Sequence, residues 1–437
     1  MNTDTFNACD GPTDLIERYL LTVFYYSTGG DNWNNNNGWL AGSIHHCNNG
    51  WKGITCGADG RVDQIKLQKN NLVGVLPLEI AALASLSNIR LFDNKLYGSI
   101  PKEIYDLEYL YFVDLERNQL TGELFVDQIF QSAKTLAKFR MSENEFVGSI
   151  PTEIGLMTNL EELWFASNSI VGTIPSEITA LTSMERLIVY NNELTGTIPS
   201  NIGLMTNLDW MDVSVTNITG VIPPSIGNLH KLRILILQSM QLTGELPSSI
   251  SNLSNLEQFL AEENDFIGPI PDLSNLVQLE KLVLLRNSLT GSLSDIGPNL
   301  VFIDIRENNI GGAIPESLFT LNQDKIKTVY LSNNTISGPI PASYGKASSL
   351  TDLWLDGNDL TGTIPDIEEG DLPQITEILF DENRLSGEVP EGICNLINEI
   401  PDQFFSLHAD CYPRPGTDVP NNPCDCCTDC GVGKDNS

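Results

Sequence analysis

Nine cysteines are the residues of this chain with the clearest chemical potential, because a thiol can bind a metal or form a disulfide. They stand at positions 9, 47, 56, 394, 411, 424, 426, 427 and 430, and none lies between Cys56 and Cys394. This placement favours disulfides that close the two ends of the structure in an oxidising compartment. The odd count leaves one thiol free or bonded to another chain, and Cys9 is our candidate for it.

The C-terminal cysteines have a spacing that would also suit zinc: Cys424, Cys426, Cys427 and Cys430. Thiolate ligands need reduced sulfur, which an exported protein seldom keeps, so we expect disulfides. Cys394 and Cys411 are the expected pair upstream of this cluster, although spacing alone fixes no connectivity.

Other side chains that could hold a metal or catalyse a reaction form no complete site. His45, His46 and Cys47 are consecutive, but no second pair of ligands follows at a metal-binding spacing, so we interpret them as loop residues. The acidic run 366–371 and the pair at 262–263 lack the spacing of an EF-hand calcium loop. No nucleophile elbow, HExxH or dinucleotide-binding motif occurs. We therefore expect no enzyme activity, no cofactor and no bound metal.

The composition narrows the classes of partner. The chain has 437 residues and a formal net charge of −33, with 24 Lys and Arg against 57 Asp and Glu. This excess of acid argues against nucleic acid or an anionic membrane surface, since both require concentrated positive charge. No apolar run is long enough to predict a transmembrane segment. The first residues lack the basic and apolar regions of an export signal, so in an exported protein that signal would be trimmed or lie outside this sequence.

One sequence motif recurs along most of the chain, and the strands and turns that it forms must hold any functional side chains in place. It reads LxxLxxLxLxxNxLxGxIP, and its asparagine position falls at residues 70, 94, 118, 144, 168, 192, 216, 240, 264, 287, 308, 334, 358 and 383. The LxL segment alternates apolar and variable residues, as a strand does. One unit cannot bury its own leucines, so stacked units should form a parallel sheet over a continuous apolar interior. The Asn amide should bond backbone groups of adjacent turns.

The LxGxIP part of this motif resembles that of plant-type leucine-rich-repeat proteins. The resemblance implies an α/β repeat solenoid, a right-handed horseshoe or superhelix with its parallel sheet on the concave side. It also implies that Cys47 and Cys56, which flank Trp51, form the disulfide of an amino-terminal cap. The motif YYSTGGDNW and the terminal CxCCxxC resemble extracellular repeat proteins of diatoms and related algae.

These features predict three parts of the chain. Residues 1–61 form an N-terminal cap, residues 62–393 hold fourteen repeats, and residues 394–437 form a Cys-rich cap and tail. In the first cap, Asp14 and Glu17 have the spacing of a capping box before an amphipathic helix.

The variable strand positions should point away from the leucines, toward solvent. In the first four repeats the position between the two core residues is charged: Lys66, Arg90, Asp114 and Arg140. In the fifth to tenth repeats it is mostly apolar: Trp164, Ile188, Asp212, Ile236, Leu260 and Val283. Neighbouring outward positions add Tyr190, Trp210, Ile234 and Leu285.

Large apolar groups on a solvated sheet face tend to mark an interaction site, and Trp and Tyr often anchor one. High β-propensity would also favour such residues in strands, but the first four repeats use charged residues at the same place. We therefore predict that ligand binding uses Trp164, Ile188, Tyr190, Trp210, Asp212, Ile234, Ile236 and Leu260. Tyr330 and Trp354 form a weaker second group.

Two repeats in this stretch lack the asparagine and carry Thr216 and Met240 instead. A hydroxyl replaces part of the bonding of an amide, whereas a thioether replaces none. Tolerated variation would explain both residues, and so would a functional distortion. We predict a slight irregularity of the array beneath the apolar face.

The leading functional hypothesis is an extracellular or cell-surface, receptor-like module that binds a peptide, protein or glycan, with a co-receptor or an enzyme target as a further partner. One alternative is an inhibitor of a wall-degrading enzyme that uses acidic residues: Asp114, Glu116, Asp212 and Glu262. Another is a structural or adhesive wall protein bridged by calcium. Three sequons predict glycosylation in an exported protein: Asn217, Asn252 and Asn333.

Overall fold

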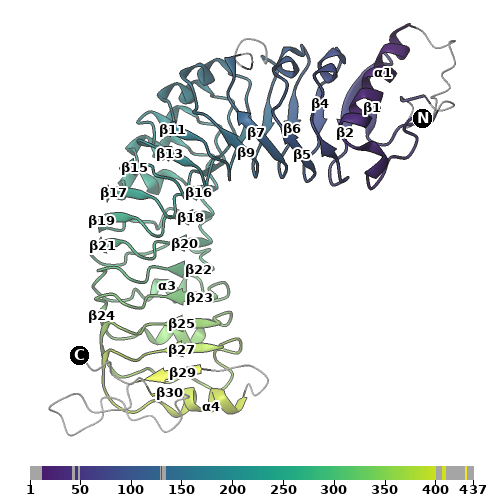
Figure 1. Cartoon of the computed structure of the whole chain (residues 1–437). Helices are drawn as coiled ribbons and strands as arrows, with labels where there is room; N and C mark the ends of the chain where they lie inside the picture. The colour runs from purple at the N-terminus through teal and green to yellow at the C-terminus, as the bar shows by residue number, and fades with distance from the viewer. Residues whose placement is uncertain are drawn as a thin grey trace, which may run out of the picture. The chain divides into compact units, whose positions relative to one another are not determined.

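The structure is a computed structural model, and it describes residues 12–41, 45–47, 50–127, 129, 134–399, 406–409 and 429–430. The chain divides into two compact units, Met1–Ile218 and Thr219–Ser437. In each unit one short strand recurs with every repeat and lies beside the strand of the next repeat (Figure 1). Each unit is therefore a repeat solenoid, which confirms the predicted fold class.

The main sheet of the first unit is parallel apart from β1 (Ile54–Cys56), which pairs antiparallel with the next strand. Its parallel strands follow chain order: β2 (Val62–Lys66), β4 (Asn88–Arg90), β6 (Phe112–Asp114), β8 (Lys138–Arg140), β10 (Glu162–Trp164), β12 (Arg186–Ile188) and β14 (Trp210–Asp212). The register is regular, so that Leu163 lies opposite both Phe139 and Leu187. These middle residues are buried and form the core below the sheet.

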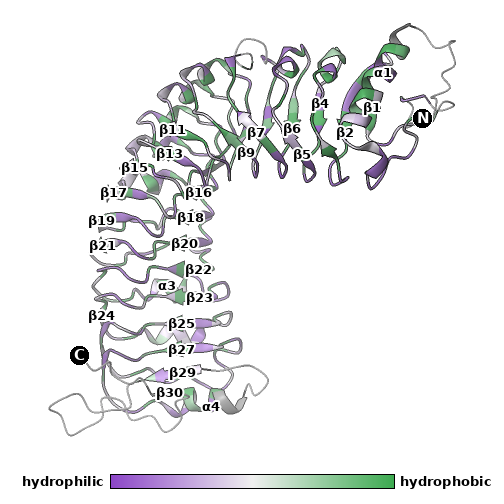
Figure 2. Cartoon of the chain, in the orientation of Figure 1, coloured by the Kyte–Doolittle hydropathy of each residue, from purple (hydrophilic) through white to green (hydrophobic). Residues whose placement is uncertain are grey.

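The main sheet of the second unit is built in the same way. Its strands are β16 (Ile234–Ile236), β18 (Gln258–Leu260), β20 (Lys281–Val283), β22 (Phe302–Asp304), β23 (Thr328–Tyr330), β25 (Asp352–Trp354), β27 (Glu377–Leu379), β29 (Ser406–Ala409) and β30 (Asp429–Cys430). In both units hydrophobic and hydrophilic residues alternate within each repeat rather than gathering in separate stretches of chain (Figure 2). This alternation places one face of each sheet on the core and the other toward solvent.

The LxG part of the motif forms further short parallel strands. In the first unit these are β3 (Val73–Gly74), β5 (Lys95–Gly98), β7 (Gln119–Glu123), β9 (Glu145–Val147), β11 (Val171–Thr173) and β13 (Glu193–Thr195). In the second unit they are β15 (Thr219–Gly220), β17 (Gln241–Glu245), β19 (Asp265–Pro269), β21 (Ser288–Thr290), β24 (Ser337–Gly338), β26 (Asp359–Gly362) and β28 (Arg384–Leu385). Glycine is needed here: Gly196 has φ +80°, and a Cβ would lie 2.7 Å from Cγ2 of Thr173.

The Ile-Pro step is followed by a short helical turn in most repeats. In the first unit these turns are η2 (Leu78–Ala82), η3 (Lys102–Asp106), η4 (Thr152–Leu156), η5 (Ser176–Ala180) and η6 (Ile202–Leu204), with η1 (Gly30–Asn32) in the cap. In the second unit they are η7 (Pro224–Asn228), η8 (Ser248–Asn252), η9 (Ala342–Lys346), α3 (Ser317–Thr320) and the longer α4 (Glu391–Glu399). Proline precedes most of these turns, as Pro175 precedes η5, and it suits an extended residue because it fixes φ and needs no hydrogen-bond acceptor.

The asparagines form the predicted ladder of buried amides. Nδ2 of Asn192 donates to the carbonyls of Phe165 at 3.0 Å and Val189 at 2.9 Å, and its Oδ1 accepts from the backbone of Ile170 at 3.0 Å. Asn308 makes the same three contacts in the second unit. Each amide thereby satisfies backbone groups of its own repeat and of the preceding one.

The residue before each asparagine position has a left-handed backbone in all fourteen repeats. This includes Val215 before Thr216, with φ 52°, and Ser239 before Met240, with φ 51°, beside 53° at Asn191. The predicted irregularity is therefore wrong for this backbone turn. Only the side-chain bonding changes: the hydroxyl of Thr216 donates to the carbonyl of Val213 at 2.9 Å. The rest of the repeat holds the turn in shape.

The first cap contains a helix, α1 (Pro12–Ser27), and a loop closed by the disulfide between Cys47 and Cys56. The helix begins before Asp14, so the predicted capping box is wrong. Glu17 is instead buried inside the cap, where its Oε2 accepts from the backbone of Val62 at 3.1 Å and lies 3.2 Å from Nε2 of His46. The carboxylate ties the helix to the first parallel strand.

Of the other cysteines, Cys394 in α4 is disulfide-bonded. Cys9, Cys411, Cys424, Cys426 and Cys427 lie outside the described residues, and of Cys430 only the strand backbone is described. The three-part domain division and the remaining disulfides stay predictions.

Candidate ligand-binding face

The outward-pointing residues of the main sheet, here called the sheet face, differ sharply between strands of the first unit. On β10, β12 and β14, Trp164, Ile188 and Asp212 lie opposite one another, as the repeat spacing predicts. Tyr190 follows β12, and Trp210 opens β14 opposite Arg186. The sequence thus brings five of the eight predicted ligand-binding residues onto three adjacent strands. We call this part of the sheet face the aromatic patch.

The side chains of the aromatic patch cover one another more than the sequence suggested. Trp164, Tyr190 and Trp210 are half-buried, whereas Ile188 is only 6% exposed. Strands spaced about 4.8 Å apart bring large neighbouring side chains into contact, which removes the middle one from water. The expectation that Ile188 faces open solvent is therefore wrong. It supports the rings on either side.

Two indoles in the aromatic patch have unused hydrogen-bonding capacity. Nε1 of Trp164 and Nε1 of Trp210 are buried, and neither has a hydrogen-bond partner among the residues that the structure describes. An indole N–H left without an acceptor in a buried place costs on the order of 1–3 kcal/mol. A carbonyl of a bound chain would supply the missing acceptor.

Asp212 is the acidic member of the aromatic patch, and it is bound locally. Its Oδ1 accepts from the hydroxyl of Ser214 at 2.6 Å and from the backbone of Ser214 at 3.2 Å. The side chain is 6% exposed, and burial raises its pKa. Asp114 is similarly covered, at 3% exposed. The acidic surface expected for an enzyme inhibitor is therefore absent at both residues, because neighbouring side chains cover them.

The second unit contains the other three predicted residues. Ile234 and Ile236 lie on β16 and are half-buried, with Ile236 opposite Leu260 of β18. Leu260 is 9% exposed and lies opposite Val283 of β20. Leu260 therefore offers less open surface than expected, for the same reason as Ile188.

The weaker group in the second unit is a compact aromatic cluster. The rings of Tyr330 and Trp354 are 4.2 Å apart, and the guanidinium of Arg306 lies 4.6 Å and 4.8 Å from their centroids. Arg306 is held by two hydrogen bonds to Asp304, at 2.9 Å and 2.7 Å. Burial raises the pKa of Tyr330 to about 12. The indole of Trp354 also has a partner, since its Nε1 donates to Oε2 of Glu377 at 2.9 Å.

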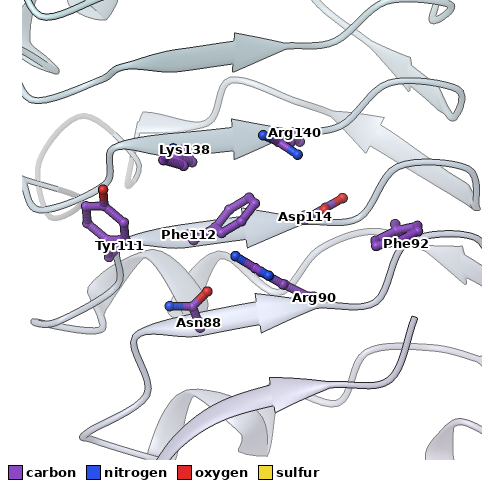
Figure 3. Close-up of a pocket in the computed structure, with 8 residues that line it drawn as sticks. All are labelled: Asn88, Arg90, Phe92, Tyr111, Phe112, Asp114, Lys138 and Arg140. Atoms are coloured by element: carbon purple, nitrogen blue, oxygen red, sulfur yellow. The ribbon is translucent and has the colours of Figure 1, made fainter. Parts of the chain in front are cut away.

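A cavity that the sequence did not predict lies on the sheet face of β4, β6 and β8 in the first unit. Its volume is about 270 Å³, and we call it the cationic pocket. Figure 3 shows Phe112 at its centre between the strands of Arg90 and Arg140, with Tyr111 and Phe92 at opposite ends. Asn88, Asp114 and Lys138 complete the lining.

Stacked cations and rings hold the cationic pocket together. The guanidinium of Arg90 lies 4.3 Å from the ring centroid of Phe112, and that of Arg140 lies 5.1 Å from Phe112 and 3.8 Å from Trp164. Such contacts contribute roughly 0.5–2 kcal/mol each. The signal for this arrangement was present in the sequence, as arginines at matching positions two repeats apart with a phenylalanine in the repeat between them. Only the register of the strands shows that these three side chains stack on one another.

Glu162 lies on β10, beside the cationic pocket, and binds two of the cations that line it. Its carboxylate accepts hydrogen bonds from Lys138 at 2.9 Å and from Nε of Arg140 at 2.7 Å. Burial acts to raise its pKa, but these two cations outweigh that effect and lower it. Lys138 and Arg140 are thus partly neutralised.

Two carboxyl groups beside the cationic pocket have raised pKa values. Burial raises the pKa of Asp114, against the opposing effect of Arg140 and Arg90. Burial and then the charge of Asp114 raise the pKa of Glu116 to about 7. The charge of this part of the sheet face therefore changes near neutral pH.

The sequence raised two other candidate sites: a metal site at His45, His46 and Cys47, and the three glycosylation sequons. Atoms of His45, His46 and Cys47 lie within 4.8 Å of one another, but the Cys47 sulfur is in a disulfide and His46 faces Glu17. The loop interpretation therefore fits better than a metal site. Asn217, Asn252 and Asn333 are all exposed, so glycosylation there is sterically open and stays a prediction.

Comparisons with known proteins agree with this geometry. The family model for Leucine Rich Repeat matches residues 159–181, 231–253, 299–321 and 325–347. The ectodomain of the Arabidopsis receptor kinase HAESA, solved with an N-terminally extended IDA peptide hormone, superposes with a TM-score of 0.78 over 95% of this chain and 66% of that one, at 26% identity. Four segments of the chain are thus leucine-rich repeats, and its fold is that of a plant receptor-kinase ectodomain.

Other leucine-rich-repeat proteins match over different extents. Receptor-like protein 39 of Arabidopsis thaliana is 33% identical over 133 residues, which are 29% of this chain and 14% of that protein. A leucine-rich-repeat protein of Leptospira interrogans is 27% identical, with a TM-score of 0.62 over 79% of this chain and 83% of that one. The chain thus matches only a small part of the length of its plant sequence relatives. Similarity to diatom proteins stays a prediction.

Within the described residues, no helix has the length and apolar character needed to cross a membrane.

Proposed function

We propose that this protein is an extracellular, receptor-like and non-catalytic ectodomain that binds a peptide or protein segment on its sheet face. In the first unit the contacts come from the aromatic patch, with Trp164, Tyr190 and Trp210 as anchors. In the second unit the predicted contact residues are Ile234 and Ile236, which are half-buried, and the less exposed Leu260. Binding to a preformed sheet loses little ordering entropy, which favours recognition of a flexible ligand.

The unpartnered indole N–H groups of Trp164 and Trp210 carry this proposal. Half-buried aromatic rings give a ligand apolar contact area, and a peptide backbone supplies carbonyl acceptors at regular intervals. HAESA, which has the same fold, was solved with a peptide hormone and, in a second structure, with the co-receptor SERK1 as well. These relatives support a peptide ligand, and a co-receptor as a further partner, for this chain.

Peptide display on the full chain tests the proposal. A random peptide library is selected on the wild type, and the enriched peptides are synthesised and titrated by calorimetry. The variant Trp164→Ser/Tyr190→Ser/Trp210→Ser should weaken their binding at least about a hundredfold, because interface aromatics each contribute roughly 2 kcal/mol or more.

Tyr97→Ser/Tyr109→Ser is the matched control, since both of these tyrosines are exposed in the first unit and neither belongs to the aromatic patch. This control should keep wild-type affinity, and thermal melting should show that both variants are folded. Equal affinity of the triple variant and the wild type for every enriched peptide would refute the aromatic patch as the binding site.

A further inference from the structure

The cationic pocket holds two buried polar atoms that the protein leaves unused. Oδ1 of Asn88 and Nε of Arg90 have no hydrogen-bond partner within the described part of the chain, and both line the same cavity. They lie on one strand, β4, two residues apart and on the same face. One atom needs a donor and the other an acceptor, so a complementary ligand must offer both within a short distance.

The charges around the cationic pocket favour an anionic group beside Arg90. Lys138 and Arg140 are engaged by Glu162, whereas Arg90 stacks on Phe112 and forms no ion pair among the described residues. A carboxylate is the natural partner of a guanidinium, because two parallel N–H groups can bind its two oxygens. Asp114 lies opposite Arg90 in the sheet and is affected by its charge, yet the two side chains form no ion pair.

The ends of the cationic pocket are aromatic, and this restricts the ligand further. Tyr111 and Phe92 stand at opposite ends of the cavity, as Figure 3 shows. The faces of aromatic rings are electron-rich and attract weakly positive C–H groups. A cavity of about 270 Å³ is smaller than most drug-sized sites and suits a group of the size of one sugar ring.

We propose that the cationic pocket binds a uronic acid unit of an acidic polysaccharide. The sugar carboxylate pairs with Arg90, and a hydroxyl of the same ring donates to Oδ1 of Asn88. The ring C–H groups lie against the aromatic ends of the cavity. An acidic peptide could satisfy both atoms, with a side-chain carboxylate for Arg90 and a backbone N–H for Asn88, but it offers no saturated ring whose C–H groups could lie against Tyr111 and Phe92.

Calorimetry with trigalacturonate as the probe tests this site on the full chain. The wild type should bind it, and Arg90→Gln should weaken binding at least about tenfold, as expected for loss of one charge-assisted hydrogen bond. Asn88→Ala should weaken binding several-fold. Arg117→Gln is the matched control, because Arg117 is exposed, pairs with Glu143 and does not line the cavity.

Two further probes separate the ligand classes. A neutral trigalactoside should bind at least about tenfold more weakly than trigalacturonate, because it lacks the carboxylate. Triaspartate should also bind more weakly, because it lacks sugar rings to lie against the aromatic ends of the cavity. Absence of trigalacturonate binding at millimolar concentration, or unchanged affinity in Arg90→Gln, would overturn the proposal. Triaspartate binding as tight as that of trigalacturonate would overturn it too, in favour of a general anion site.

This inference does not rest on the peptide function. Trp210→Ser lies outside the cationic pocket and should leave trigalacturonate binding unchanged, whereas Arg90→Gln should leave peptide binding unchanged. Failure of one proposal can therefore be told from failure of the other.

Discussion

The sheet face of β4, β6 and β8 and that of β10, β12 and β14 belong to one unit and share one construction, yet they present different chemistry. Below the sheet both have buried aliphatic or aromatic residues at the same positions, such as Leu110 and Leu160. Above it the first region carries stacked arginines and rings around a cavity, and the second carries half-buried indoles. The interior determines the fold, and the outward positions vary without changing it.

We expect the free energy of unfolding to depend equally on the buried residues of both regions. Leu110→Ala and Leu160→Ala should each lower the free energy of unfolding by about 3 kcal/mol, because each leaves a cavity in a fully packed core. Chemical denaturation measures this. A difference of more than about 2 kcal/mol between the two variants would break the claim that the regions share one interior.

The pH dependence of stability should distinguish the regions next. Burial and the charge of Asp114 raise the pKa of Glu116 from 4.5 to about 7. The folded state therefore binds this proton more tightly than the unfolded state, so the stabilisation is complete below pH 4.5 and is lost as the pH rises through about 7. Glu116→Gln should abolish this loss of stability, which is about 2 kcal/mol between pH 4.5 and about 7 once solvent screening of the partly exposed carboxyl is allowed for.

Glu193→Gln provides the control for this measurement, since Glu193 is an exposed carboxylate in the same unit. Its unfolding free energy, followed by denaturation between pH 4.5 and 8, should keep the wild-type slope. An unchanged slope in Glu116→Gln would show that the raised pKa is not a property of the cationic region.

The turns after β12 and β14 differ in their hydrogen bonds, and we expect this difference to have a smaller effect on stability. The turn after β12 has the full amide bonding of Asn192, whereas the turn after β14 has only the hydroxyl of Thr216. Thr216→Asn should add about 1 kcal/mol of stability, because the new amide can reach the carbonyl of Val189 in the preceding repeat. Asn192→Thr should lose a similar amount. A gain in the second variant would contradict the ladder argument.

The smallest effect concerns the residue before Thr216. Val215 is β-branched, 41% exposed and held at φ 52°, a backbone region that suits asparagine far better. Val215→Asn should therefore stabilise the first unit by about 0.5–1 kcal/mol, measured as a shift in the denaturation midpoint. Val147→Asn, at an exposed valine in strand β9, is the control and should bring no gain.

The sequence predicted those features that depend on one repeat and its immediate neighbours. The burial of Leu163 and Leu187 and the bonding of Asn192 follow from a period that places the same residue in the same environment each time. The cationic pocket did not follow, since it depends on the stacking of Phe112 with arginines that belong to the repeats on either side. Contacts between unlike outward residues have no period to reveal them.

Two further differences come from contacts between residues that are far apart in the sequence. Ile188 was expected in solvent because strand alternation gives direction but not lateral coverage by large neighbours. Glu17 was expected to cap a helix because its spacing from Asp14 fits that motif, but the helix begins earlier and the carboxylate serves Val62. In both cases the deciding contact comes from a distant segment of chain.

The buried amide ladder has a consequence for local opening. Asn192 bonds the carbonyl of Phe165 and the amide of Ile170 in the preceding repeat, so releasing one turn strips its neighbour of two partners. Fluctuations that admit water or a protease should therefore involve several turns at once, and amide hydrogen exchange along the ladder should be slow and collective. Thr216 forms only a hydroxyl hydrogen bond within its own repeat, so we expect such a cooperative segment to end there.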